Sequence, residues 1–278
     1  MRSDAGQAFL ASCRALGLEV EYELHAMKEL LPRGLFGKSP ALFRMNEQGE
    51  RTPDANLCVH SPQALEIVAE NAVAISRALR PTTGRHFLWG DDARPWCRCT
   101  RCCGLSDSDQ ALLLGNRMLD ALQRDDPAAR LAHLAYGTTL WPPRQVRPRP
   151  GIFLEFAPLH RRHDIPYAAQ DGVACKDSLA ALDANLEAFG RETAQVLEYW
   201  LDASRFSGWK RPAVRIPWNR EVFAADLATY GSRGIRHITT FAAWVDAAYV
   251  ARHGDPPLEA YGADLARLLP RTPKPSGG

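Results

Sequence analysis

Two adjacent aspartates, Asp91 and Asp92, follow the short apolar run of residues 86–90. Neighbouring carboxylates can divide the work of acid–base catalysis, because one ionised group raises the pKa of the other and keeps it able to donate a proton near neutral pH. Successive strand residues face opposite sides, so both side chains reach one site only if the strand ends between them, as Gly90 allows. We therefore predict Asp91 and Asp92 as catalytic residues. In the alternative, structural interpretation, one of them caps the next turn or pairs with Arg94.

Four of the seven cysteines lie within residues 97–103. Three of them, Cys97, Cys99 and Cys102, have the spacing C-x-C-x-x-C, and Cys58 or His60 is a candidate for a fourth metal ligand. Three thiolates and one further ligand complete the tetrahedral shell that zinc prefers. The pattern indicates a structural zinc site, with Cys58 as the fourth ligand; buried reduced thiols and a disulfide are the alternatives. Redox catalysis is not indicated, because no C-x-x-C pair precedes a helix in a thioredoxin-like unit.

Further polar and aromatic side chains stand near the ends of other predicted strands. Aromatic rings can stack on the faces of sugar rings, while carboxylates and imidazoles bind hydroxyl groups. In the alternative interpretation the same residues are core aromatics, a buried histidine and salt-bridged glutamates. Glu155 and Glu198 could instead supply a conventional acid and a nucleophile or base. The candidate substrate-binding residues are Glu23, His25, Tyr136, Glu155, Glu198, Trp200 and Trp244.

The elements that carry these residues alternate along the chain. Helical periodicity covers residues 7–16, 63–79, 109–122 and 179–189. Runs rich in β-branched and aromatic residues cover 18–25, 86–90, 130–136, 151–158, 195–202 and 237–244. Strands that alternate with helices predict an α/β fold with parallel βαβ units. No glycine-rich phosphate loop follows any of these strands, which argues against a nucleotide-binding fold.

The polar strand ends favour one architecture within the α/β class. In a (β/α)8 barrel the carboxyl ends of the strands converge on one mouth, where the chemistry takes place. Six strands are visible rather than eight, so the sequence predicts an incomplete TIM-type (β/α)8 barrel that lacks its first two βα units. We expect one domain over residues 1–270 and a disordered tail over 271–278.

Composition narrows the classes of partner. The chain is 46% hydrophobic and 24% charged, and its net charge of +2 gives no general attraction to nucleic acid. No run approaches the 18 apolar residues of a membrane span, and the first residues lack the basic flank and apolar middle of a signal peptide, so we expect a cytoplasmic protein. An unpaired strand at the barrel opening invites association, so we expect a homodimer.

Several segments together carry a resemblance to a known family. They include "YELHAMKELLP", "DDARPWCRCTRC", "SDSDQALLLGNRM" and "LAHLAYGTTLWPPRQVRPRPGIFLEFAP". The chain resembles domain of unknown function 4838 over roughly residues 15–265, a family of glycoside-hydrolase-like (β/α)8 barrels. That family is similar to glycoside hydrolase family 163, the endo-β-N-acetylglucosaminidases that act on complex N-glycans.

The resemblance implies hydrolysis of glycans that contain N-acetylglucosamine. Substrate-assisted enzymes of this kind use the 2-acetamido group of the sugar as the nucleophile. By that likeness Asp91 would orient the acetamido group and Asp92 would protonate the leaving oxygen. No organic cofactor is implied, and the partner is a carbohydrate. The alternatives are a barrel remnant that binds carbohydrate without catalysis and a metal-dependent barrel hydrolase.

Overall fold

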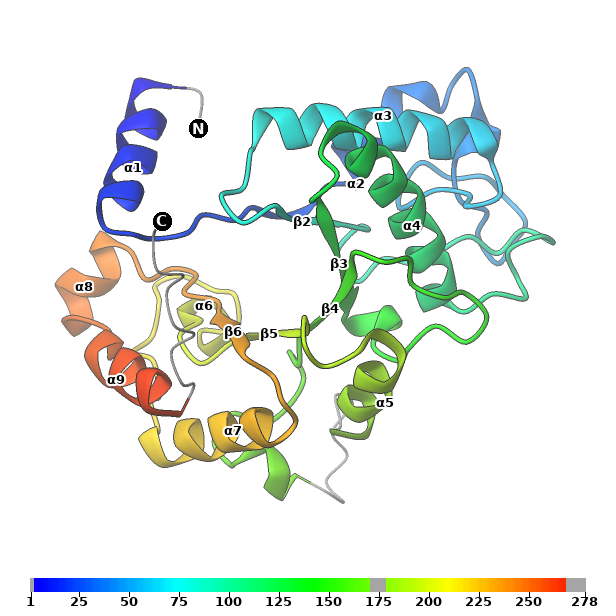
Figure 1. Ribbon diagram of the computed structural model, residues 1–278. Coiled ribbons are helices and arrows are strands. Elements are labelled where there is room, and N and C mark those ends of the chain that lie inside the picture. Colours follow the sequence, from blue (N-terminus) through cyan, green and yellow to red (C-terminus); the bar gives the residue numbers. More distant parts are fainter. Residues whose placement is uncertain (1–2, 171–178, 269–278) are drawn as a thin grey trace. The chain divides into compact units, whose positions relative to one another are not determined.

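The computed structural model describes residues 3–170 and 179–268 (Figure 1). The residues up to Glu155 form one compact unit, and those from Phe156 onward form a second. The single domain expected over residues 1–270 stays a prediction. The tail at residues 271–278 lies outside the described residues.

The first unit contains long helices and parallel strands. Its strands are β1 (Glu23–His25), β2 (Arg85–Trp89), β3 (Arg130–Ala135) and β4 (Ile152–Phe156, which runs into the second unit). Its α-helices are α1 (Asp4–Ala15), α2 (Met27–Leu30), α3 (Pro62–Ala78) and α4 (Asp107–Asp125). Three short 3-10 helices, Arg33–Leu35, Pro40–Leu42 and Gly137–Thr139, lie in the connecting loops.

The second unit carries two further strands and five α-helices among its described residues. The strands are β5 (Gln195–Glu198) and β6 (His237–Thr240), which pair in parallel. The helices are α5 (Leu179–Phe189), α6 (Ala203–Phe206), α7 (Arg220–Ser232), α8 (Ala247–His253) and α9 (Leu258–Leu268). A 3-10 helix covers Tyr167–Ala169.

The expected TIM-type barrel is wrong. The strand order is β1-β2-β3-β4-β5-β6, so β1 and β6 stand at the two ends of the order, and the pairs β1–β2, β2–β3 and β5–β6 are parallel. A barrel needs its last strand to pair with its first, at a strand number and stagger that close the ring. Over residues 3–170 and 179–268 the chain instead forms an open six-stranded α/β sheet.

The ends of the two longest helices follow from local capping chemistry. The Ser61 hydroxyl accepts from the backbone N–H of Ala64, and Pro62 occupies the first turn of α3, where its missing N–H costs nothing. At α4, Ser106 and Asp109 form a capping box. These signals place the helices close to the predicted ranges 63–79 and 109–122.

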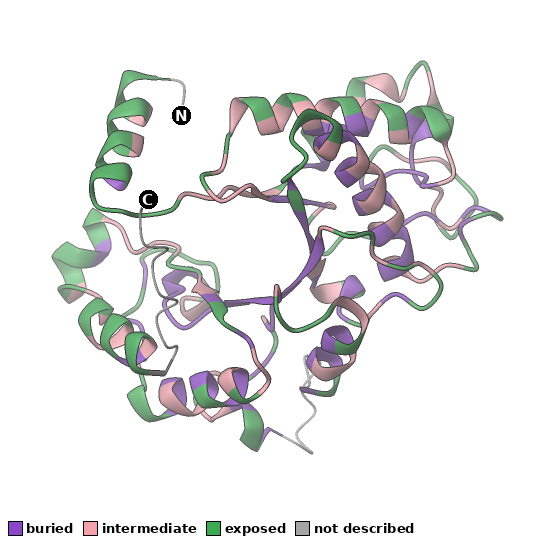
Figure 2. Ribbon diagram, in the orientation of Figure 1, coloured by how far each residue is buried: buried purple, intermediate pink, exposed green. Residues whose placement is uncertain are grey.

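The buried faces of these elements form the core of the first unit. Helix α4 packs against both α3 and β3, and Figure 2 shows strand β3 and the facing side of α4 as buried. On the sheet, the Phe87 and Phe153 rings meet edge to face at 5.5 Å between centroids. The Arg85 guanidinium lies 4.3 Å from the centroid of the Phe153 ring. This packing fixes the strands whose carboxyl ends carry the candidate site.

Candidate functional site

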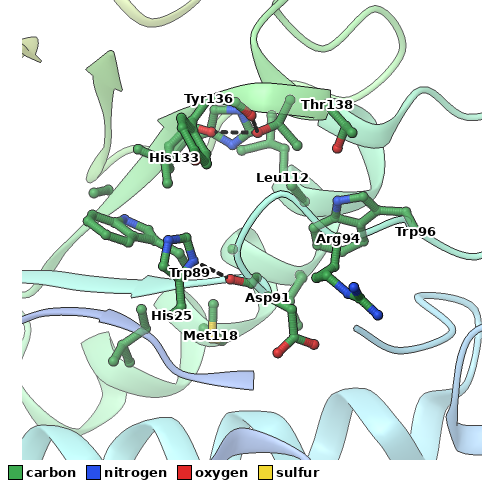
Figure 3. Close-up of a pocket in the computed structure, with 18 of the residues that line it drawn as sticks. His25, Trp89, Asp91, Arg94, Trp96, Leu112, Met118, His133, Tyr136 and Thr138 are labelled. Carbon is green, nitrogen blue, oxygen red and sulfur yellow. Dashed lines mark hydrogen bonds between the residues drawn. The ribbon is translucent and has the colours of Figure 1, made fainter. Parts of the chain in front are cut away.

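A pocket lies at the carboxyl ends of β1, β2 and β3 (Figure 3). Its empty volume is about 580 Å³, counting the part that is open to solvent. The β1–β2 register pairs His25 with Trp89, and their rings meet edge to face at 5.2 Å between centroids. The Tyr136 ring lies 6.4 Å from His25. The lining includes His25, Trp89, Asp91, Arg94, Trp96, Leu112, Met118, His133, Tyr136 and Thr138.

Asp91 reaches the pocket, but its carboxylate is held by protein groups. Its Oδ2 accepts from the Arg33 guanidinium and from the backbone N–H of Asn56 at 2.6 Å. The side chain is 11% exposed, and in Figure 3 its carboxylate points away from Tyr136. Asp91 therefore ties the loop after β2 to the loop that contains Arg33 and Asn56.

Asp92 has different surroundings. Its side chain is 67% exposed, and its Oδ1 lies 3.7 Å from Nε2 of His25. The other ring nitrogen, Nδ1, lies 2.7 Å from the Gly90 carbonyl oxygen. A carbonyl oxygen can only accept, so Nδ1 carries a proton and Nε2 is the nitrogen that faces Asp92. The 3.7 Å separation is that of an ion pair rather than a hydrogen bond, and Asp92 is not among the described residues that line the pocket.

Two more buried polar side chains line the pocket. Trp89 is 6% exposed, and its indole Nε1 has no hydrogen-bond partner among the described residues. His133 is fully buried, and this burial lowers its pKa to about 4. The lining residues therefore include an unpaired N–H donor that has almost no exposed surface and a histidine that stays neutral near pH 7.

Glu23 and Glu155 are placed on the same sheet but are not among the described residues that line the pocket. Glu155 is completely buried in β4, and Glu23 is half-buried in β1. Burial lowers the pKa of Arg85, whereas Glu21, Glu155 and Glu23 raise it, so this guanidinium lies in the field of all three carboxylates. Glu23 and Glu155 therefore belong to a charge cluster of the sheet.

In the second unit, Glu198 and Trp200 take part in a buried polar network. Glu198 accepts from Arg161 Nε at 3.0 Å and from the Tyr230 hydroxyl. Asp226 accepts from Arg161 and from the Trp200 indole at 3.0 Å. Burial alone would raise the pKa of Glu198, but Arg161 and its other partners hold that pKa at about 2. The paired charges satisfy each other within the unit.

Trp244 follows β6 in a left-handed backbone conformation with φ of 62°. The Arg211 guanidinium lies 4.7 Å from the centroid of its ring, and Asp246 accepts from Arg211 at 2.9 Å. Trp244 also packs against buried residues that include Leu201 and Tyr249. One face of the Trp244 ring is therefore covered by Arg211 of the same unit.

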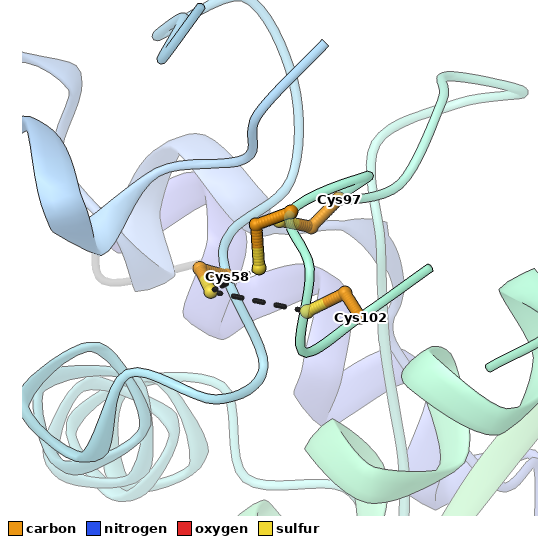
Figure 4. A group of neighbouring side chains, drawn as sticks. Cys58, Cys97 and Cys102 are labelled. Atoms are coloured by element: carbon orange, nitrogen blue, oxygen red, sulfur yellow. Dashed lines mark hydrogen bonds between the residues drawn. The ribbon is translucent and has the colours of Figure 1, made fainter. Parts of the chain in front are cut away.

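Four cysteines come together in the first unit (Figure 4). The Sγ atoms of Cys58, Cys97, Cys99 and Cys102 all lie within 4.8 Å of one another, and all four residues are buried. Cys58 Sγ lies 3.8 Å from that of Cys99 and 3.9 Å from that of Cys102. A disulfide would need about 2 Å between sulfurs. The predicted ligand set is thus assembled as free thiols that could bind a metal ion.

Groups around the cluster suit thiolate ligands. The Met45 backbone N–H donates to Cys97 Sγ at 3.3 Å, and Arg51 approaches the same sulfur at 3.7 Å. His60 is not one of the four clustered residues; its Nδ1 lies 3.2 Å from Cys102 Sγ. Hydrogen bonds from Cys102 and Cys97 lower the pKa of the Cys58 thiol, and the same contact with Cys58 raises the pKa of the Cys102 thiol. Outer contacts of this kind orient metal ligands and offset their negative charge.

Cys103 is excluded from the cluster although it is adjacent to Cys102. It is exposed, and its Sγ donates to the Thr100 carbonyl oxygen at 3.2 Å. Adjacent residues of a tight turn point in different directions, so only one of the two thiols can face the shared centre.

The residues that sequence reasoning missed come mainly from loops. Asn56 and Arg33 fix Asp91, and Trp89 and Trp96 line the pocket. A usable signal existed for Asn56 only, since it lies two residues before a predicted metal ligand. Loop contacts of this kind have no periodicity to reveal them.

The family comparison covers this part of the chain. A family model described as "Domain of unknown function (DUF4838)" matches residues 7–185. The chain belongs to the DUF4838 family. The DUF4838 match includes every residue of the pocket and all four clustered cysteines, and it ends before β5.

Two further comparisons give no match: no curated protein and no solved structure matches the DUF4838 chain. A search of the described residues finds no helix with the length and apolar character to cross a lipid bilayer.

Proposed function

We propose that the pocket at the ends of β1, β2 and β3 binds carbohydrate that contains N-acetylglucosamine. Its walls combine the Trp89, Trp96 and Tyr136 rings with polar groups of His25 and Thr138. Aromatic faces suit the apolar side of a pyranose ring, and the polar groups suit its hydroxyls and amide. The resemblance to glycoside hydrolase family 163 supports the same class of ligand.

One observation carries the proposal furthest: the unpaired indole N–H of Trp89. Buried N–H groups almost always find a partner, since an unsatisfied donor costs about 1–3 kcal/mol. This nitrogen has almost no exposed surface, so a sugar hydroxyl or acetamido oxygen would accept the hydrogen bond only after neighbouring side chains move aside.

The test compares two tryptophan variants. Trp89→Phe keeps an aromatic ring but removes the N–H, so the affinity for N,N′-diacetylchitobiose should fall roughly tenfold. Trp141→Phe is the matched control, because Trp141 is 50% exposed and is not one of the lining residues. Isothermal titration calorimetry measures both affinities. Equal affinity in Trp89→Phe, or no binding of this sugar by the wild-type protein, would contradict the proposal.

A second candidate function is hydrolysis of the bound glycan by substrate-assisted retaining catalysis. The observation that favours it is the exposed Asp92 carboxylate, whose Oδ1 lies 3.7 Å from Nε2 of His25, a residue that lines the pocket. In this reaction the acetamido oxygen of the substrate attacks the anomeric carbon while Asp92 protonates the leaving oxygen. This attack breaks the glycosidic bond and closes a ring between the acetamido oxygen and the anomeric carbon. Water then adds to the anomeric carbon, opens that ring and returns a proton to Asp92.

Binding without turnover is favoured by the fixed position of Asp91. Its Oδ2 is already engaged by Arg33 and Asn56, so orienting an acetamido group would have to use its remaining oxygen. The two outcomes separate in one assay. Turnover of an aryl N-acetylglucosaminide that falls at least about 100-fold in Asp92→Asn supports hydrolysis. Asp120→Asn, at an exposed ion pair with Arg149, is the control. Binding with no turnover contradicts hydrolysis.

We also propose that the cysteine cluster holds a structural zinc ion. With Zn–S bonds of about 2.3 Å, tetrahedral geometry sets neighbouring sulfurs about 3.8 Å apart. The Cys58–Cys99 and Cys58–Cys102 sulfur separations of 3.8 and 3.9 Å fit this value, and all four sulfurs lie within 4.8 Å of one another. A closed four-thiolate shell leaves no position for substrate, so the role is structural.

Elemental analysis of the purified protein tests the zinc proposal. We expect about one zinc per chain in the wild-type protein and in Cys103→Ser, whose side chain stays outside the cluster. Cys58→Ser should lose most of the bound zinc, because one of four thiolates is removed. Zinc-free wild-type protein prepared with zinc available, or equal content in both variants, would refute the assignment.

A further inference from the structure

Asn56 joins the loop that precedes α3 to the loop that follows β2. The residue is completely buried and has a left-handed φ of 38°. Its backbone N–H donates to Asp91 Oδ2 at 2.6 Å, and its Oδ1 accepts from the Asp91 backbone N–H at 2.9 Å. These two bonds clamp both ends of Asp91.

The same side chain also holds the next part of the second loop. Asn56 Nδ2 donates to the carbonyl oxygens of Arg94 and Pro95, at 3.2 and 3.0 Å. Trp96, which lines the pocket, follows directly. A buried asparagine can use its oxygen and both N–H groups, and Asn56 uses the oxygen and donates to two acceptors.

The cysteine cluster joins these two loops a second time. Cys58 lies two residues after Asn56, and Cys97 follows Trp96. The Cys97 backbone is already bonded to the Gln110 side chain, at 3.1 Å in both directions. The links from Cys58 to Cys99 and Cys102 are thiol–thiol contacts, which hold the loops weakly because sulfur is a poor hydrogen-bonding partner. A metal ion bound to four thiolates would make this end of the junction rigid.

We infer that metal bound at the cysteine cluster fixes the pocket wall formed by Asp91 and Trp96, with Asn56 as the positioning residue between the two sites. The inference rests on the proposed zinc site. Where carbohydrate binds to this wall, the two ligands are coupled: each strengthens the binding of the other by the same factor.

Hydrogen exchange measured by mass spectrometry tests the metal's effect on the wall without any carbohydrate. Removing metal from the wild-type protein with a chelator should speed exchange in residues 90–96 by roughly tenfold or more. Peptides from β3 and from the C-terminal half of α3 should keep their protection, because the tie between α3 and the cluster lies at the other end of the helix, where the Ser61 N–H donates to the Cys58 carbonyl oxygen. Unchanged exchange at 90–96, or equal loss of protection in α3 and β3, would overturn the inference. Protein that takes up no metal would overturn it as well.

A substitution of Asn56 tests its positioning role. Asn56→Ala keeps all four cysteines, so it should retain metal, yet residues 90–96 should exchange as fast as in the metal-free protein. The matched control is Asn116→Ala, because the Asn116 side chain bonds outside the two loops, to the Arg147 carbonyl oxygen and the Arg149 N–H. Normal protection of 90–96 in metal-loaded Asn56→Ala would refute the role. If this variant loses protection in α3 and β3 too, its structure is disturbed as a whole. The inference is then judged by hydrogen exchange of the wild-type protein with and without the chelator.

The effect of metal on carbohydrate affinity is measured in a separate binding experiment. If N,N′-diacetylchitobiose binds, metal removal should weaken it by at least about fivefold, and the sugar should raise metal affinity by the same factor. An affinity for the sugar that does not change when the metal is removed would contradict the coupling. If no sugar binds, the proposed function fails while the exchange result still stands.

Discussion

Asp91 and Asp92 are chemically identical neighbours with different surroundings. Asp91 is 11% exposed and bound to Arg33 and Asn56, whereas Asp92 is 67% exposed beside His25. The dipeptide marks a candidate for paired carboxylate chemistry, but the roles depend on loop residues 35 or more positions away. At this scale, sequence identifies which residues can do chemistry, and tertiary contacts decide which of them are already occupied.

His133 should make the stability of the first unit depend on pH. Its folded-state pKa is about 4, against an ordinary value of 6.5, because burial disfavours the charged form. Below pH 6.5 the unfolded chain therefore takes up a proton that the folded chain refuses until near pH 4. The free energy of unfolding should fall as pH falls through this range, by about 2 kcal/mol between pH 7 and 5.

Urea unfolding at pH 7 and pH 5 measures this loss. His133→Gln is neutral at both values, so the drop between them should shrink by about 2 kcal/mol relative to the wild-type protein. An identical drop in both proteins would show that His133 is not the source.

At the scale of elements, helices with local signals were predictable and others were not. Helix α3 begins and ends one residue earlier than predicted, because Ser61 and Pro62 mark its start. Helix α7 was missed: its buried residues include Val222, Phe223 and Asp226, so apolar and polar side chains mix on the buried face. Periodicity finds helices with one apolar stripe, and α7 lacks one.

The end of β2 needs glycine for a steric reason. A Cβ on Gly90 would lie 2.9 Å from Asn56 Oδ1 and 2.9 Å from the Trp96 ring. Both neighbours are held in place, so Gly90→Ala should destabilise the protein by about 1–3 kcal/mol. Gly104→Ala is the control, because no atom lies within 4 Å of its added Cβ.

Thermal or urea unfolding of both glycine variants measures the difference. A Gly90→Ala protein as stable as Gly104→Ala would mean that the junction of Asn56 and Trp96 yields easily. That result would also weaken the case for a rigid wall beside the pocket.

At the scale of the whole molecule, association through a sheet edge remains a prediction. In the strand order of the described residues, β1 and β6 each have one neighbouring strand. Unpaired strand edges can pair with a second chain, so we expect a homodimer in solution. Light scattering measures the molar mass, and a monomer at high concentration would contradict the expectation.

The sequence by itself determined the α/β class, the approximate positions of the six strands and the cysteines that come together in one cluster, because periodicity and cysteine spacing are local properties of the chain. It did not determine that the strands form an open sheet, since ring closure depends on how distant strands stagger and pair. Nor did it predict that Glu198 and Trp200 join a buried network with Arg161 and Asp226. The tertiary structure decided these points, because burial and charge pairing depend on residues that are far apart in the chain.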